Sequence, residues 1–256
     1  MNNILLLTDF SEASLHAGQY AALLTHQLRS QRLMLYHAYE VMMPIPAADI
    51  PVSPASYPPE VSAQEGEELR RSSLRALQAV YDNLRGLAYE ATIMEYRTEE
   101  ANLGISINDI AKEADADLVI MAITDNGKLE RMFLGNDAVQ VADVSDYPVL
   151  VVPPSTPLIP IKRIVFAYDP KLPPETKHAA RLKKLLDDLQ AQVDVVNFDT
   201  TDPATNILEF ATARKASLII AIHKNRSFFE RLFHRSTTHQ LAYQTTIPLL
   251  VAHSMR

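Results

Sequence analysis

The sequence contains no cysteine and only six glycines in 256 residues. Without cysteine, neither a disulfide framework nor a thiolate metal site can form. No apolar run approaches the length of a transmembrane helix, and no secretory signal follows Asn2 and Asn3. We therefore expect a cytoplasmic protein without a membrane partner.

Glycine is missing altogether from residues 161–256. Glycine-rich loops bind phosphate groups because a backbone without side chains can approach the ligand closely. A loop of this kind is not expected in that part of the chain. The whole sequence also lacks a Walker A lysine motif.

Charge is distributed unevenly along the chain. Residues 1–160 carry 10 basic and 22 acidic side chains, a net charge of −12, whereas residues 161–256 carry 14 basic and 9 acidic side chains, a net charge of +5. Opposite charges favour docking of the two parts on each other, or a binding role for the basic part. Two solvated surfaces explain the asymmetry equally well. The acidic total of −7 argues against a nucleic-acid partner.

The chain repeats one pattern after a hundred residues. Residues 117–153 match residues 217–253 without a gap, so that Pro148 aligns with Pro248. Each copy reads as a short apolar strand, a loop, a helix and a second apolar strand. This period is too long for a solenoid, and it indicates two copies of one domain. Residues 4–9 match residues 164–169 at the larger offset of 160, so about sixty residues are missing from the second copy.

Strand and helix patterns alternate in the first copy, which is typical of a parallel sheet with helical crossovers. Ser11 is a good N-cap for the first helix, and Asn102 or Ser106 for the third. Residues 42–59 hold six of the 16 prolines and are expected to form an exposed loop. The expected strands are 4–7, 33–39, 88–96, 118–123 and 149–152, and the expected helices are 12–27, 65–84, 105–114 and one leading from the Gly135 loop towards the last strand.

These patterns predict an α/β fold: a doubly wound, mostly parallel, Rossmann-like five-stranded sheet, duplicated in tandem and shortened to four strands in the second copy. We expect a first domain at 1–153, a proline-rich linker at 154–160 and a second domain at 161–256, each with its own sheet. The two last strands, 149–152 and 249–252, are expected at a domain or subunit interface. The chain would then be a homodimer or an intramolecular pseudo-dimer.

Ligands of open α/β sheets bind at the carboxyl ends of the strands, where the strand order reverses. In the first copy these ends carry Thr8 and Asp9 after the first strand, Ala38 in the second, and the loop 122–136 after the fourth. A glycine before a helix offers backbone N–H groups and a positive dipole to an anion.

At these positions the segments ILLLTDFSEAS, LYHAYE and YPVLVVP resemble the universal stress protein family. The resemblance covers almost the whole chain as a tandem pair. It implies a stress-response protein that binds ATP, with Mg²⁺ only alongside the nucleotide. Carried over residue by residue, it places Asp9 near the adenine, Ala38 at a backbone contact, Ala122, Asp125 and Gly135 at three glycine positions, Asn136 at a Ser/Thr position, and Lys128 near the anion.

Two of the three glycine positions therefore lack glycine. Ala122 adds a methyl group beside the ribose, and Asp125 adds a carboxylate beside the phosphates. In the second copy the same three positions hold Ile222, Asn225 and Arg235. We therefore expect nucleotide binding in the first domain only, without catalysis. The alternative is a scaffold protein whose nucleotide pockets are degenerate.

Other candidate sites have simpler explanations. Ser11 and Ser14 lie near His16, but a cap and a helix surface explain them better than a hydrolase site does. No two histidines have the spacing of a metal site with an acidic partner. The second copy also holds a basic cluster, which a solvated face explains better than an acidic partner does: Arg226, Arg231, His234, Arg235 and His239. An apolar cluster lies among these residues, and core packing explains part of it while the rest is expected at an interface: Phe228, Phe229, Leu232 and Phe233.

Overall fold

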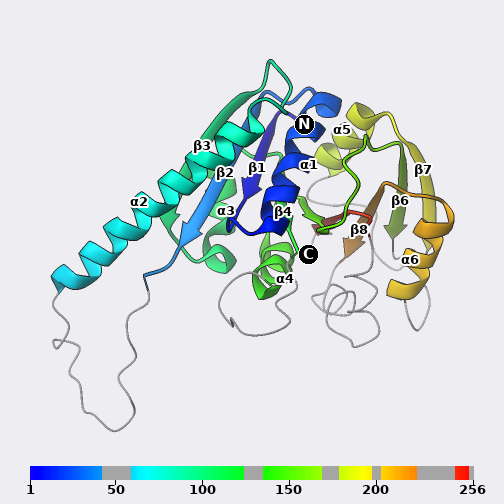
Figure 1. The fold of residues 1–256 in the computed structure, drawn as a ribbon. Helices are drawn as coiled ribbons and strands as arrows, with labels where there is room; N and C mark the ends of the chain where they lie inside the picture. Colours follow the sequence, from blue (N-terminus) through cyan, green and yellow to red (C-terminus); the bar gives the residue numbers. More distant parts are fainter. Residues whose placement is uncertain (42–58, 124–134, 169–178, 198–202, 224–245, 254–256) are drawn as a thin grey trace, which may run out of the picture.

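The computed structural model describes residues 1–41, 59–123, 135–168, 179–197, 203–223 and 246–253 (Figure 1). Strands and helices alternate along the described chain, as the sequence predicts. Their order is β1 (Asn3–Leu7), α1 (Glu12–Leu28), β2 (Arg32–Tyr39), α2 (Pro59–Leu84), β3 (Ile93–Glu100), α3 (Leu103–Glu113), β4 (Leu118–Ala122), α4 (Gly135–Val144), β5 (Val149–Val152), β6 (Arg163–Tyr168), α5 (Ala179–Leu189), β7 (Gln192–Asn197), α6 (Pro203–Ala213), β8 (Leu218–His223) and β9 (Leu249–His253).

One nine-stranded sheet runs through the described chain in the order β3-β2-β1-β4-β5-β9-β8-β6-β7. All neighbours within each half are parallel, whereas β5 and β9 pair antiparallel with Leu150 opposite Leu250. The prediction that the two last strands lie at an interface is therefore confirmed, within one chain. The expectation of two separate sheets is wrong, because the exposed edges of β5 and β9 satisfy each other's backbone hydrogen bonds.

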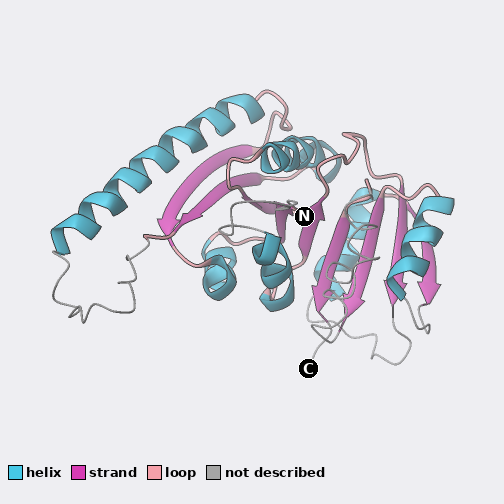
Figure 2. Ribbon diagram, turned by 60° about the horizontal axis from the view of Figure 1, so that its bottom comes forward, coloured by secondary structure: helices cyan, strands magenta, loops and turns pink. Residues whose placement is uncertain are grey.

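Helices cover both faces of this sheet (Figure 2). One face is covered by α1, α2 and α5, whose leucines pack on strand residues such as Leu6, Leu33 and Ile164. The other face is covered by α3, α4 and α6, which pack on residues such as Val119 and Val165. Because both faces are buried there, inner strands such as β1 and β4 are continuous apolar runs rather than alternating ones.

The second half lacks counterparts of α2 and β3, as the missing sixty residues predict. Leu33 and Leu35 on β2 are fully buried beneath the helices. Their counterparts Val193 and Val195 on β7 are 41% and 61% exposed. The outer end of the second half-sheet is thus a strand whose apolar face has no helix over it among the described residues.

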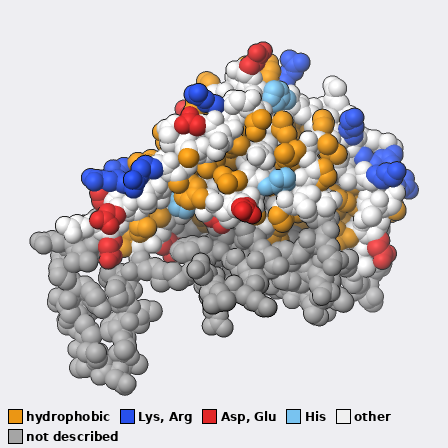
Figure 3. Space-filling view, in the orientation of Figure 1, with side chains coloured by type: hydrophobic (Ala, Val, Ile, Leu, Met, Phe, Trp, Pro, Cys, Tyr) orange, Lys and Arg blue, Asp and Glu red, His pale blue; other side chains and the backbone are white. Residues whose placement is uncertain are grey.

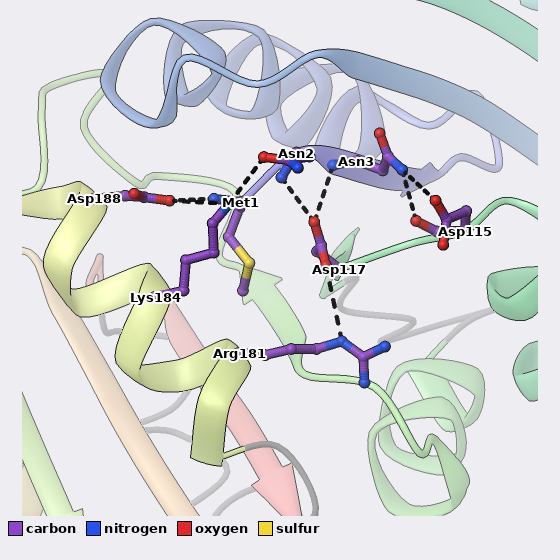
Figure 4. A network of polar contacts seen from close by, with 8 residues as sticks. All are labelled: Met1, Asn2, Asn3, Asp115, Asp117, Arg181, Lys184 and Asp188. Atoms are coloured by element: carbon purple, nitrogen blue, oxygen red, sulfur yellow. Dashed lines mark hydrogen bonds and ion pairs between the residues drawn. The ribbon is translucent and has the colours of Figure 1, made fainter.

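Polar contacts around the first residues of the chain join the two halves (Figure 4). The Met1 amino group pairs with Asp188 on α5. The Asn2 N–H donates to Asp117 Oδ2 at 2.7 Å, and Lys184 donates to Asn2 Oδ1 at 2.8 Å. Met1 and Asn2 precede β1 in the first half, and Asp188 and Lys184 lie on α5 in the second, so the two contacts to α5 fix the halves against each other.

Two predicted boundaries need correction. The third strand is Ile93–Glu100 rather than 88–96, because residues 88–92 contain a turn in which the Thr92 N–H donates to the Tyr89 carbonyl. The second helix begins at Pro59, a position that tolerates proline because its missing N–H would have no helical partner. Of the predicted proline-rich loop, residues 42–58 lie outside the described residues.

Candidate functional site

A cavity of about 1360 Å³ opens at the carboxyl ends of β1 and β2. Three of the residues selected from the sequence, Thr8, Asp9 and Ala38, line it together. The cavity is bounded on its other sides by α2 and by the start of α3. Its remaining lining residues are His37, Tyr39, Glu40, Val41, Glu65, Glu68, Leu69, Arg71, Ser72, Leu74, Arg75, Ala101 and Leu103.

The turn after β1 is held by its own side chains. Asp9 Oδ1 accepts from the Ser11 N–H at 3.1 Å and from the Ser11 hydroxyl at 2.6 Å. Ser11 caps α1 as predicted, and Thr8 Oγ1 accepts from the Phe10 N–H at 3.1 Å. These bonds stabilise Phe10 at a φ of 66°, which is unfavourable for a large side chain. Asp9 is therefore fixed at the edge of the cavity, and Oδ2 takes no part in these bonds.

His37 contributes an acceptor to the same cavity. Its Nδ1 lies 2.8 Å from the Thr8 carbonyl oxygen, and its ring lies 4.3 Å from the Phe10 ring. A carbonyl oxygen only accepts, so Nδ1 carries the proton of the neutral ring and Nε2 is unprotonated. Burial lowers the pKa of His37, which favours this neutral form.

The wall formed by α2 was not selected from the sequence. Glu65, Glu68, Ser72 and Arg75 follow one another at spacings of three and four residues, which places them on one face of the helix. That periodicity was visible in the sequence. Nothing in it indicated that this polar face turns towards the ends of β1 and β2, because the long connection between β2 and α2 leaves the direction of the helix open.

The remaining selected residues lie towards β4. Ala122 is buried, and it lines a smaller cavity of about 20 Å³ together with Thr8 and Asp9. Asp125 and Lys128 lie outside the described residues. Gly135 and Asn136 are the first two residues of α4, so the glycine belongs to the helix and not to the preceding loop.

In the second half, the first glycine position is occupied by Ile222, a partly buried residue of β8. Asn225, Arg235 and the basic and apolar clusters that follow lie outside the described residues. The described part of the chain contains no group of three or more side chains suited to hold a metal ion. Among its helices, none combines the length and apolar character required to cross a bilayer.

Comparison with known proteins agrees with this architecture. A universal stress protein from Archaeoglobus fulgidus DSM 4304 superimposes with a TM-score of 0.58 at 14% identity, over 99% of this chain and 96% of its own. A functionally unknown protein from Pseudomonas aeruginosa PAO1 gives a TM-score of 0.55 at 12% identity, over 98% and 92%. The cytoplasmic domain of a prokaryotic cation chloride cotransporter gives 0.51 at 10% identity, over 99% and 95%.

No curated protein matches the chain. The sequence model of the universal stress protein family matches residues 1–153 and again residues 165–253. These two matches correspond to the two halves of the nine-stranded sheet and account for nearly the whole chain. The chain belongs to the universal stress protein family, with two copies of its domain in tandem.

Proposed function

We propose that this chain is a non-catalytic stress-response protein of the cytoplasm that binds an adenine nucleotide through its first half only. Mg²⁺ would enter only with the nucleotide. Binding itself would be the signal, because an occupied cavity presents a different surface to partner proteins. The first domain is taken as 1–153, followed by a linker at 154–160 and a second domain at 161–256.

The cavity between β1, β2 and α2 is the main support for this proposal. It lies at the carboxyl ends of parallel strands, where ligands of open α/β sheets bind, and Thr8, Asp9 and Ala38 line it together. Its volume of about 1360 Å³ exceeds the range of about 300–1,000 Å³ that is usual for small-molecule sites, so a nucleotide has room.

The serine hydroxyls and the histidine that follow Asp9 along the chain support a role without catalysis. The Ser11 hydroxyl donates to Asp9, and the Ser14 hydroxyl donates to the Ser11 carbonyl. His16 bonds through Nε2 to the carbonyl of Thr156, 2.8 Å away. A nucleophile requires a base beside it, and these three residues are engaged in structural contacts instead.

Thermal shift with adenosine, AMP and ATP, the last with magnesium, tests the proposal. A ligand that binds only the folded chain raises the melting temperature by mass action. Gly135→Asp adds a carboxylate at the start of α4 and should abolish any shift that depends on phosphates. Ser236→Ala in the second half is the matched control and should leave the shift unchanged.

The alternative function is a protein-interaction scaffold. It is favoured by the departures at Ala122 and Asp125, which replace two of the glycines expected for a phosphate-binding loop. If none of the three ligands shifts the melting temperature at about 1 mM, the nucleotide proposal fails and the scaffold function is retained.

A further inference from the structure

The charged lining of the large cavity is acidic on balance. Four carboxylate side chains, those of Asp9, Glu40, Glu65 and Glu68, line it together with the two guanidinium groups of Arg71 and Arg75. Figure 3 shows acidic and basic side chains close together over the α2 end of the molecule. A site that holds a polyphosphate would be expected to carry the opposite balance.

One of the two arginines is already paired. Arg71 Nε lies 2.7 Å from Glu67 Oε1, and Glu67 also pairs with Arg70 at 2.8 Å. Within the part of the chain that the structure describes, Arg75 has no ion-pair partner. Among the described lining residues, one cation thus remains without an ion-pair partner, against four carboxylates.

The two segments that border the site in sequence do not reverse this balance. Residues 42–58, which join β2 to α2, contain Asp49 and no lysine or arginine. Residues 124–134, which join β4 to α4, contain two acidic and two basic side chains and so have no net charge. Both segments lie outside the described residues.

Other features of the lining are suited to a ligand that combines hydrogen-bond donors with an aromatic ring. His37 Nε2 is an acceptor because Nδ1 donates to the Thr8 carbonyl. Asp9 bonds to Ser11 through Oδ1, and among the described residues Oδ2 is its second acceptor without a bonded donor. Leu69, Leu74 and Leu103 supply apolar surface on which an aromatic ring can pack. Adenine combines an aromatic ring with an amino group that donates.

We propose that the cavity recognises the nucleoside part of an adenine nucleotide and repels its polyphosphate, so that adenosine binds more tightly than ATP. This inference rests on the proposed function, and it names the ligand class within it. Each added phosphate brings negative charge towards the carboxylates of the lining, whereas the adenine and the ribose are neutral.

Isothermal titration of the full chain with adenosine, AMP and ATP, in EDTA and at low ionic strength, tests this inference. Affinity should fall along that series, with adenosine and ATP separated by on the order of tenfold. Added salt should strengthen ATP binding by screening the repulsion and should leave adenosine binding unchanged.

The variant Glu68→Gln removes one carboxylate from the cavity wall, while Glu90→Gln removes an exposed carboxylate elsewhere. Only the first should improve ATP affinity relative to adenosine affinity, by about two- to fivefold. Circular dichroism checks that both variants fold. ATP binding that is tighter than adenosine binding at low salt, and that weakens as salt is added, would overturn the inference and leave the proposed function standing. If none of the three ligands binds, both this inference and the proposed function are wrong.

Discussion

Gln27 holds both backbone groups of Ile161. Its Nε2 donates to the Ile161 carbonyl at 2.7 Å, and its Oε1 accepts from the Ile161 N–H at 2.9 Å. Nε2 also donates to the carbonyl of Leu189 at 3.1 Å. Gln27 belongs to α1 of the first half, whereas Ile161 precedes β6 and Leu189 ends α5 in the second, so one side chain links the two halves.

Gln27→Ala should destabilise the chain. It leaves three partly buried backbone groups without their partner, at a cost of about 1–3 kcal/mol in the free energy of unfolding. The melting temperature should fall by roughly 2–4 °C for each kcal/mol lost. Gln64→Ala, at an exposed position of α2, is the control and should change it little. Equal effects of the two variants would mean that Gln27 does not couple the halves.

Equivalent positions of the two half-sheets should respond differently to truncation. Leu35 is 0% exposed, whereas its counterpart Val195 is 61% exposed. Leu35→Ala should lower the free energy of unfolding by about 2–5 kcal/mol, and Val195→Ala by less than about 1 kcal/mol. Only the first substitution leaves a cavity in a packed core. Urea denaturation measures both values. A large cost at Val195 would show that this strand face is covered in solution.

Replacing two helical glycines by alanine should change the free energy of unfolding in opposite directions. A Cβ at Gly18 would lie 3.0 Å from Leu84 Cδ1 in the core, whereas at Gly66 it would lie 3.4 Å from Val41 Cγ2. Gly18→Ala should destabilise by about 1–3 kcal/mol through overpacking. Gly66→Ala should stabilise by roughly 0.5–1 kcal/mol, since alanine favours the helix. Thermal denaturation of the two variants gives the comparison, which fails if both change stability in the same direction.

Stability should decrease on acidification through His37. Burial lowers its pKa below the ordinary value of 6.5, so the unfolded chain binds the proton more tightly than the folded chain does. The contribution of His37 is therefore independent of pH above about 6.5, and stability is lost as the pH falls from there through the lower, folded pKa. Asp9, which favours the protonated ring, offsets part of this loss.

Denaturation of the wild type and of His37→Asn between about pH 7.5 and pH 5 isolates this effect, because asparagine keeps a donor for the Thr8 carbonyl but does not titrate. The variant should lose less stability on acidification than the wild type. If both proteins show the same pH dependence, titratable groups other than His37 cause the loss of stability on acidification.

Much of the fold could be predicted from the sequence, because buried parallel strands are short continuous apolar runs. The match of residues 117–153 with residues 217–253 identified the duplication. The larger offset between residues 4–9 and 164–169 showed that a helix and a strand are missing from the second copy. The third strand was misplaced because Ile93–Glu100, at the sheet edge, consists of exposed and half-buried residues without a continuous apolar run. Its position is fixed by pairing with β2, as between Leu35 and Tyr96.

The candidate site was predictable only in part. Thr8, Asp9 and Ala38 follow from the rule that ligands bind at strand ends, and the structure brings these three residues together. The wall from α2 could not be predicted, because its polar face is equally typical of a solvated helix. That wall brings two carboxylates and two guanidinium groups into the cavity, so the acidic balance comes from Asp9 and Glu40, and which of these charges meet depends on packing.

The sequence by itself determined the duplication, the alternation of strands and helices, the loss of sixty residues from the second copy and the absence of glycine there. Each of these follows from local composition and spacing. Only the tertiary structure decided that the two half-sheets join as one through β5 and β9, and that α2 turns its carboxylates towards the ends of β1 and β2. Pairing between strand edges and the direction of a helix after a long connection depend on contacts between distant residues, which local pattern does not encode.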